Sequence, residues 1–144
     1  MTLSKLHQPN DLNALDIRAF ANAGAWMEVK HPISNENLVN EAGQPWRVLL
    51  AGKDSFTYRL ASSEAIQRRV AEAVRVTPEI LERERVSVLH QCVLNWENFV
   101  KDGEDFPCTP ANAEHMVENY PWFGEQIENF ILSREQYFLA NTKP

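Results

Sequence analysis

The stretch that decides the fold runs from Leu94 to Ile131 and reads LNWENFVKDGEDFPCTPANAEHMVENYPWFGEQIENFI. It combines many aromatic side chains with two breaking signals, at Asp102-Gly103 and at Pro121. We expect the end of one helix, a polar turn, a short helix and the start of a last helix. Six aromatic residues flank the two breaks: Trp96, Phe99, Phe106, Tyr120, Trp122 and Phe123.

Toward the C-terminus, Thr109-Pro110 is a helix start signal, because threonine supplies a capping oxygen and proline suits the first turn. The short helix should end near Tyr120, since Pro121 cannot continue it but can begin the next one. Aromatic and aliphatic residues at spacings of three and four then predict a last helix from Pro121 to about Leu139. Residues 140–144 are expected to fray.

Toward the N-terminus, two further helices are expected before the aromatic stretch. Asp54 or Ser55 can cap one that runs to about Arg75. Thr77 can cap a second one, whose apolar face continues through Cys92 to Trp96.

Residues 25–52 have a different pattern, with two apolar runs separated by turn-forming residues. One short strand should contain Trp26 and end before Pro32, and a second should lie within residues 45–52, with room for a third at 38–39. Trp26 and Trp46 are the expected packing residues of this ribbon. A short helix from Asp11 should precede it and end at Gly24.

The predicted fold class is therefore α+β, mainly α. A small N-terminal β-hairpin of two or three short strands packs on a bundle of about four helices. One domain of residues 1–144 suits the length. Its parts are a loose arm (1–10), a short helix plus β-ribbon (11–52), a helical part (53–139) and a frayed tail (140–144).

The net charge of −6 is unevenly distributed, and almost all of the excess lies in residues 86–144. Nucleic-acid binding needs a basic face, so no nucleic-acid partner is predicted. The start of the sequence lacks the apolar core of a signal peptide, and no run is long enough to span a membrane. Together with two cysteines, these features favour a cytoplasmic protein with reduced thiols.

Candidate chemical sites are few. His90, Cys92, Cys108 and His115 suggest a metal site, but two residues that are two apart on a helix face opposite sides. Cys108 lies near several carboxylates, which should raise the pKa of its thiol and disfavour a nucleophile. Phosphate-binding and hydrolase motifs do not occur in the sequence. We predict no catalytic, cofactor-binding or metal-binding residues.

The six aromatic residues are the only candidate site. Such side chains are most often core residues, but Trp and Tyr also anchor contacts between proteins. We predict that Trp96, Phe99, Phe106, Tyr120, Trp122 and Phe123 form a protein-binding region in which most rings are buried. One or two rings, Trp122 first, should be exposed to a partner.

Several segments together resemble the tail assembly chaperone-like proteins of tailed bacteriophages and prophages. The matching segments are GAWMEVKHPIS (24–34), WRVLLAGKDSFTYR (46–59), VLNWENF (93–99) and DFPCTPANAEHMVENYPWFGEQIENFILSREQYF (105–138). The resemblance rests on short strands, a G-x-D-S-x-x-Y-R helix start, a tryptophan at a helix end and a YPW junction before the last helix.

The resemblance implies a non-enzymatic protein of the bacterial host cytoplasm. It would bind the phage tape measure protein, the tail tube protein, or both, before the tail polymerises. Two alternatives stay open: a structural tail or head–tail component that is retained in the virion, and a small acidic regulator that binds a host protein.

Overall fold

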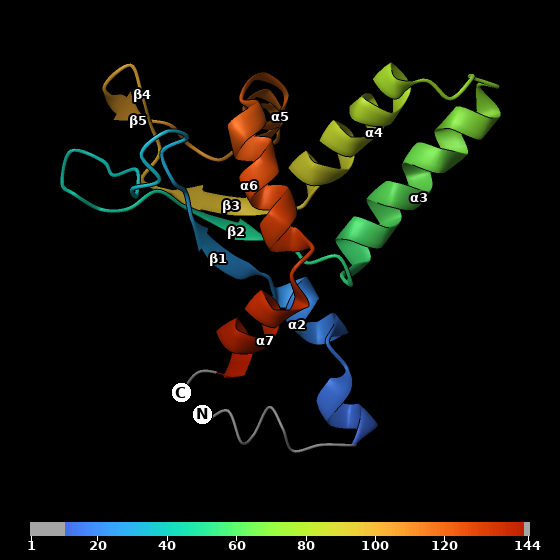
Figure 1. Ribbon diagram of the computed structural model, residues 1–144, viewed down its shortest axis with the longest axis horizontal. Coiled ribbons are helices and arrows are strands. Elements are labelled where there is room, and N and C mark those ends of the chain that lie inside the picture. The colour runs from blue at the N-terminus through green and yellow to red at the C-terminus, as the bar shows by residue number, and fades with distance from the viewer. Residues whose placement is uncertain (1–10, 143–144) are drawn as a thin grey trace.

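A three-stranded antiparallel sheet lies at the centre of the protein, with helices on several sides (Figure 1). The structure is a computed structural model that describes residues 11–142, so the predicted arm 1–10 and residues 143–144 lie outside the described residues. The helices are η1, a 3₁₀ helix (Leu12–Leu15), α2 (Arg18–Ala23), α3 (Phe56–Ala71), α4 (Pro78–Gln91), α5 (Pro110–Asn119), α6 (Pro121–Ile131) and α7 (Arg134–Thr142). The strands are β1 (Ala25–Glu28), β2 (Arg47–Leu50), β3 (Val93–Glu97), β4 (Val100–Lys101) and β5 (Glu104–Asp105).

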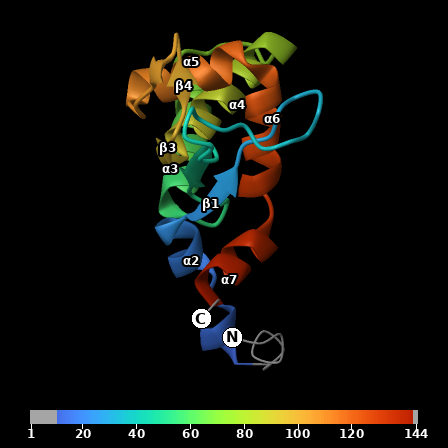
Figure 2. The same ribbon diagram turned by 90° about the vertical axis from the view of Figure 1, so that its left-hand side faces the viewer.

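This content confirms the predicted α+β class with mainly α structure. The helices pack on one another around the sheet (Figures 1 and 2). α3 lies to one side and contacts α4, and α4 in turn contacts α5 and α6 next to the sheet. α2 contacts α7 below the sheet.

The central strand of the sheet is β2, which pairs with β1 on one side and with β3 on the other. Met27, Val48 and Trp96 lie opposite one another in the register, and all three are buried. The neighbouring residues alternate to the outer face, where Arg47 lies between Glu28 and Glu97. One face of the sheet therefore belongs to the core and the other faces away from it, as expected for an antiparallel sheet.

The third strand is β3, and not the segment 38–39 for which the sequence left room. That segment forms no strand: it makes an isolated bridge between Val39 and Pro45, and Leu38 exchanges single backbone hydrogen bonds with Val29 and Trp46. The prediction of one helix from Thr77 to Trp96 was also wrong, because α4 ends at Gln91 and Cys92 is its C-cap. Apolar residues continue the helical spacing beyond Cys92, and pairing with β2 outweighs that local pattern.

The predicted polar turn is a β-hairpin, in which β4 pairs with β5. Asp102 and Gly103 form its turn, with φ of 54° and 78°. Positive φ at both central residues is the requirement of a type I′ turn, and Asp-Gly is one of its preferred sequences. The predicted helical part of residues 53–139 thus contains three of the five strands among the described residues.

Two helix ends also differ from the prediction. α3 ends at Ala71 and not near Arg75, and Ala73 has a positive φ of 50°. The predicted last helix is interrupted at Leu132–Ser133, so that α6 and α7 are separate. α7 then continues to Thr142, past the predicted end at Leu139.

The starts of α3, α4, α5 and α6 agree with the sequence signals. The helix predicted from Asp11 is instead the 3₁₀ helix η1 and the separate α2, whose N-cap Ile17 makes no side-chain hydrogen bond. The side chains of Ser55, Thr77 and Thr109 each accept a hydrogen bond from the backbone N–H three residues later. Pro121 is the first residue of α6, and Gly24 follows α2 with a φ of 84°.

The core joins the inner face of the sheet to α4, α5 and α6. α6 supplies three fully buried side chains, Phe123, Ile127 and Ile131. It is also tied to the chain just after β1, because the Gln126 side chain donates to the Lys30 carbonyl at 2.8 Å and accepts from the Lys30 N–H at 3.0 Å. α6 is thereby fixed against the edge of the sheet that carries β1.

The expectation that Trp26 packs the ribbon was wrong. Its side chain is 38% exposed on the outer face, with the Arg47 guanidinium 4.7 Å from the centre of the ring. Ala25 and Met27 are buried instead, because alternate residues of β1 face the core. Trp46, the other expected residue, does pack against the core.

Candidate functional site

All six predicted aromatic residues belong to one cluster, which we call the aromatic corner. The rings of Trp96 and Phe99 lie parallel, with centroids 4.4 Å apart. The Trp96 ring also stacks on the Phe106 ring, with centroids 5.7 Å apart. Edge-to-face contacts continue the cluster from Phe99 to Phe123 at 6.0 Å and from Phe123 to Trp122 at 6.2 Å.

The start of the cluster is fixed by β3 and the β4–β5 hairpin. The Trp96 indole N–H donates to the Phe106 carbonyl at 2.7 Å, and the Phe106 N–H donates to the Phe99 carbonyl at 2.8 Å. These bonds hold the segment after β5 against the end of β3, so the rings stack in a defined order.

The other end of the cluster is the junction of α5 and α6. Tyr120 leaves the helical conformation there, with φ of −125° and ψ of 84°, and Pro121 begins α6. The Tyr120 ring makes edge-to-face contacts with His115 at 5.9 Å and with Trp122 at 6.1 Å. Tyr120 thus lies at the outer limit of the corner.

The burial of the six rings divides them into two groups. Trp96, Phe99 and Phe123 are buried, whereas Phe106 and Trp122 are half-buried. Tyr120, and not Trp122, is the most exposed, at 37%. The buried rings are core residues, and only the outer three are accessible to a partner.

A pocket of about 100 Å³ opens between the hairpin, the end of α5 and the start of α6. We call it the corner pocket. Its lining includes Phe99, Phe106, Tyr120 and Trp122 from the predicted set.

The sequence reasoning missed two residues of this pocket that bear on binding. Trp46 stacks on Phe99 with ring centroids 4.8 Å apart, so a residue from the loop before β2 joins the corner. The Lys101 ammonium lies 5.4 Å from the centre of the Phe106 ring. The Asp-Gly turn signal could have indicated Lys101, because a tight hairpin brings residues 101 and 106 close together.

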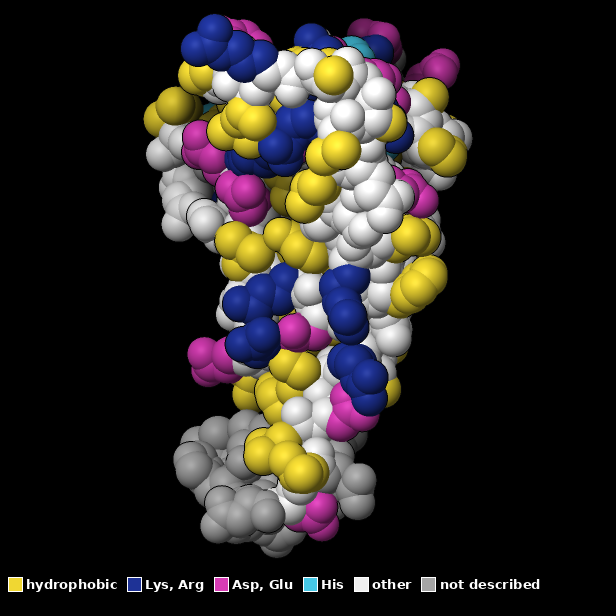
Figure 3. Space-filling view, turned by 90° about the vertical axis from the view of Figure 1, so that its right-hand side faces the viewer, with side chains coloured by type: hydrophobic (Ala, Val, Ile, Leu, Met, Phe, Trp, Pro, Cys, Tyr) yellow, Lys and Arg dark blue, Asp and Glu magenta, His cyan; other side chains and the backbone are white. Residues whose placement is uncertain are grey.

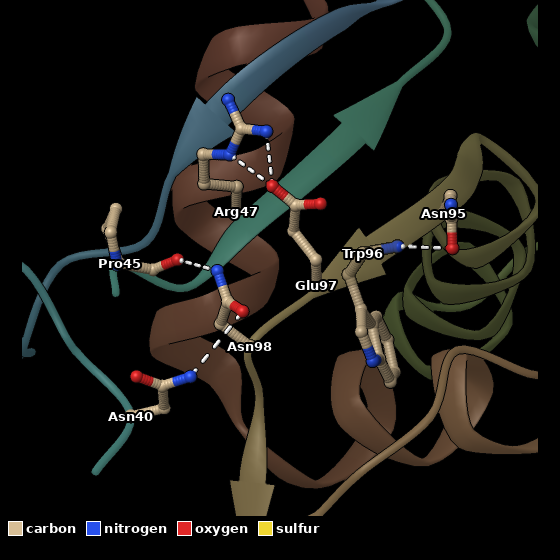
Figure 4. A network of polar contacts seen from close by, with 7 residues as sticks. All are labelled: Asn40, Pro45, Arg47, Asn95, Trp96, Glu97 and Asn98. Carbon is tan, nitrogen blue, oxygen red and sulfur yellow. Dashed lines mark hydrogen bonds and ion pairs between the residues drawn. The ribbon is translucent and has the colours of Figure 1, made fainter. Parts of the chain in front are cut away.

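Polar contacts fix the loop that carries Trp46 (Figure 4). The Asn98 side chain donates to the Pro45 carbonyl at 2.8 Å, and the Asn40 side chain donates to the Asn98 side chain at 3.5 Å. Glu97 accepts from Arg47 on the outer face of the sheet. Asn98 lies in the turn between β3 and β4, and its φ is 68°.

The cysteines and histidines do not gather into a site in the described part of the chain. No group of three or more His, Cys, Asp or Glu side chains is placed to hold a metal ion within residues 11–142. Burial raises the pKa of the Cys92 thiol to about 12. Burial is also the main cause of the raised pKa of Cys108, and not the nearby carboxylates that the sequence suggested.

Comparisons with protein-family models, curated proteins and solved structures gave no match to this chain. Among the described residues, every helix is too short or too polar to cross a membrane.

Proposed function

We propose that the protein is a non-enzymatic tail assembly chaperone of a tailed phage or prophage, which binds the tape measure protein, the tail tube protein, or both. The observation that carries the proposal is the aromatic corner, where three accessible rings surround a pocket and continue directly into the core. Rigid aromatic residues at the edge of a packed core are typical anchors of protein–protein contacts. The sequence segments that resemble the chaperone family include this corner.

The corner can bind a partner without large rearrangement. Its buried rings hold the outer ones in place, so little side-chain entropy is lost when a partner binds. An apolar segment that would otherwise aggregate gains a surface on which to bury a side chain. The protein acts in the cytoplasm of the bacterial host, where unassembled tail proteins are made.

Co-expression with the tape measure protein of the same phage or prophage tests the proposal. We expect a larger soluble fraction of a tape measure fragment when this protein is present. Tyr120→Asp should reduce that gain, because it places a charge at the outer edge of the corner. Ile33→Asp is the matched control, since Ile33 is 87% exposed and does not line the corner pocket. Equal solubility with and without this protein would contradict the proposal.

One observation favours a second function, that of a structural tail component. Four apolar side chains of α3, those of Phe56, Leu60, Ile66 and Val70, are between 43% and 72% exposed. At about 100° per residue they lie opposite the buried Ala61 and Ala65. Figure 3 shows hydrophobic side chains along the side of the molecule on which α3 and α4 lie.

Such a surface would suit permanent packing against neighbouring subunits of a particle. Mass spectrometry of purified particles separates the two functions. Stoichiometric presence of the protein in the virion favours the structural component, and absence favours the chaperone.

A further inference from the structure

The outer face of α3 carries a row of exposed side chains with the spacing of a coiled-coil seam. Successive members are four, three, four and three residues apart, which at about 100° per residue keeps them within an arc of about 80°. We call this row the α3 seam, and its members are Phe56, Leu60, Ser63, Gln67 and Val70. It lies on the side of α3 opposite the buried Ala61 and Ala65, and α3 itself lies at one side of the molecule (Figure 1).

The order of apolar and polar residues along the seam favours a partner helix that is identical and parallel. In such a pair each seam residue lies opposite its own copy, so Phe56, Leu60 and Val70 meet apolar side chains. Ser63 and Gln67 meet polar ones, and within one helix the Gln67 side chain donates to the Ser63 hydroxyl at 3.3 Å. An antiparallel pair centred on Ser63 would place Leu60 against the Gln67 amide and leave that polar group without a partner.

The charged residues beside the seam are complementary to a second copy in the same orientation. Arg59 and Glu64 are exposed on opposite flanks of the seam, and neither forms an ion pair with another described residue. They are five residues apart, which is the offset at which flanking residues of two parallel, in-register helices face each other. Arg59 of each copy therefore lies beside Glu64 of the other. In an antiparallel pair the two Glu64 flanks lie together, and so do the two Arg59 flanks, so this complementarity is lost.

The helix is already formed before a second copy binds. The Ser55 side chain caps its start, and α4 packs against it. Pairing therefore requires no ordering of the backbone, which removes a major cost of association. One pair of sixteen-residue helices is nevertheless a small interface, so the resulting dimer should be weak.

We propose that α3 pairs with α3 of a second copy of this chain, parallel and in register along the α3 seam, to form a weak two-fold dimer. Arg59 of each copy contacts Glu64 of the other, once on each edge of the interface. This inference goes beyond the proposed function, because the lining of the corner pocket contains no residue of α3. It also differs from permanent packing in a particle, since the pair forms in solution from this chain alone.

Sedimentation equilibrium of the full chain measures the association. We expect dimers with a Kd of about 10–100 μM. Val70→Lys places two like charges opposite each other in the seam and should raise the Kd at least about ten-fold. Ile33→Lys makes the same change at an exposed apolar residue outside α3 and should leave the Kd unchanged. A wild type that stays monomeric at about 500 μM, or a Val70→Lys protein that dimerises like the wild type, would overturn the inference.

Two charge reversals test the orientation. Arg59→Glu and Glu64→Arg should each raise the Kd about five-fold, because both contacts between the copies then join like charges. Mixed in equal amounts, the two variants restore both contacts, so heterodimers should form with nearly the affinity of the wild type. Both residues are exposed, so neither reversal disturbs the core. A mixture that associates no better than either variant alone would overturn the parallel pairing.

Cysteine cross-linking gives a second measurement of the register. On air oxidation Val70→Cys should form a disulfide-linked dimer with itself, because seam residues of parallel copies face each other. In an antiparallel pair Phe56→Cys would instead cross-link to Val70→Cys. The wild type is the control, since Cys92 is buried and Cys108 half-buried. Cross-links that appear only when Phe56→Cys and Val70→Cys are mixed would contradict the proposed orientation.

Discussion

Trp96 connects three parts of the molecule from one position in β3. Its ring is buried, it stacks on Phe99 and Phe106, and its N–H donates to the Phe106 carbonyl. Trp96 contributes both to the core and to the placement of the hairpin segment, so it is a sensitive position for mutation.

Trp96→Phe should lower the free energy of unfolding by about 1–3 kcal/mol, because the Phe106 carbonyl loses its donor and the smaller ring leaves space. Urea unfolding followed by circular dichroism measures the change. Trp26→Phe, on the exposed outer face, is the control and should cost less than about 0.5 kcal/mol. Similar losses for the two variants would mean that the carbonyl bond contributes little.

Asp54 and Arg134 form an ion pair that links the start of α3 to the start of α7, with oxygen–nitrogen distances of 2.7 and 3.0 Å. The Arg134 hydrogen bonds hold the pKa of the Asp54 carboxyl below its ordinary value of 3.8. A lowered folded pKa stabilises the native state above the unfolded pKa, and this stabilisation is lost as the pH falls through the folded value.

Asp54→Asn should therefore lower the melting temperature near neutral pH, and the difference from the wild type should shrink below about pH 4. Melting curves between pH 7 and pH 3 measure this. Asp105→Asn, at an exposed hairpin residue, should follow the wild type throughout. If the difference in melting temperature between Asp54→Asn and the wild type does not change with pH, the effect of the substitution comes from packing and not from the charge of Asp54.

At the scale of elements, the local start signals of the helices were predicted well and their ends less well. Caps such as Thr77 and Thr109 act within one turn, so three or four residues suffice to recognise them. β3 could not be found in the same way, because its pairing partner β2 is more than forty residues away in the chain. The six aromatic residues were found, but Trp46 joins them only through the tertiary fold.

The sequence also contains local signals for the β4–β5 hairpin and for the start of α7, although the predictions for these segments did not follow them. Asp102-Gly103 between short runs is a hairpin signal. Ser133 followed by Gln136 resembles the capping box that starts a helix, and α7 does begin at Arg134. The continuous apolar spacing across Leu132 favoured one long helix, although Leu132 is 43% exposed.

Gly103→Ala should destabilise the protein by about 1 kcal/mol, because a residue with a side chain is strained at a φ of 78°. Open space surrounds the position, so the cost arises from the backbone alone. Urea unfolding gives the value. Gly43→Ala, at a φ of 80° in an exposed loop, is a matched control for backbone strain outside the hairpin. A much smaller loss for Gly103→Ala than for Gly43→Ala would contradict the prediction.

At the scale of the whole molecule, stability is distributed unevenly between α3 and the helices that cover the sheet. α3 has sixteen residues but buries only Ala61 and Ala65, whereas the shorter α6 buries Phe123, Gly124, Ile127 and Ile131. Fewer buried apolar contacts make local opening less costly.

Amide hydrogen exchange should therefore be faster in the middle of α3 than in the middle of α6, by about ten-fold or more. Mass spectrometry of peptides from the full chain measures both rates in one sample. Equal protection of the two helices would show that α3 opens only with the whole domain. Added protection of α3 in purified particles would instead support the structural function.

The position of β3 at the edge of the sheet has a consequence for synthesis on the ribosome. β1 and β2 are made first, but a two-stranded ribbon is marginal on its own. Its third strand emerges only with residue 97, and the helix that covers its inner face only with residue 131. The N-terminal third of the chain must therefore stay without its native partners until most of the polypeptide has been translated, which makes its folding a late event in the life of the nascent chain.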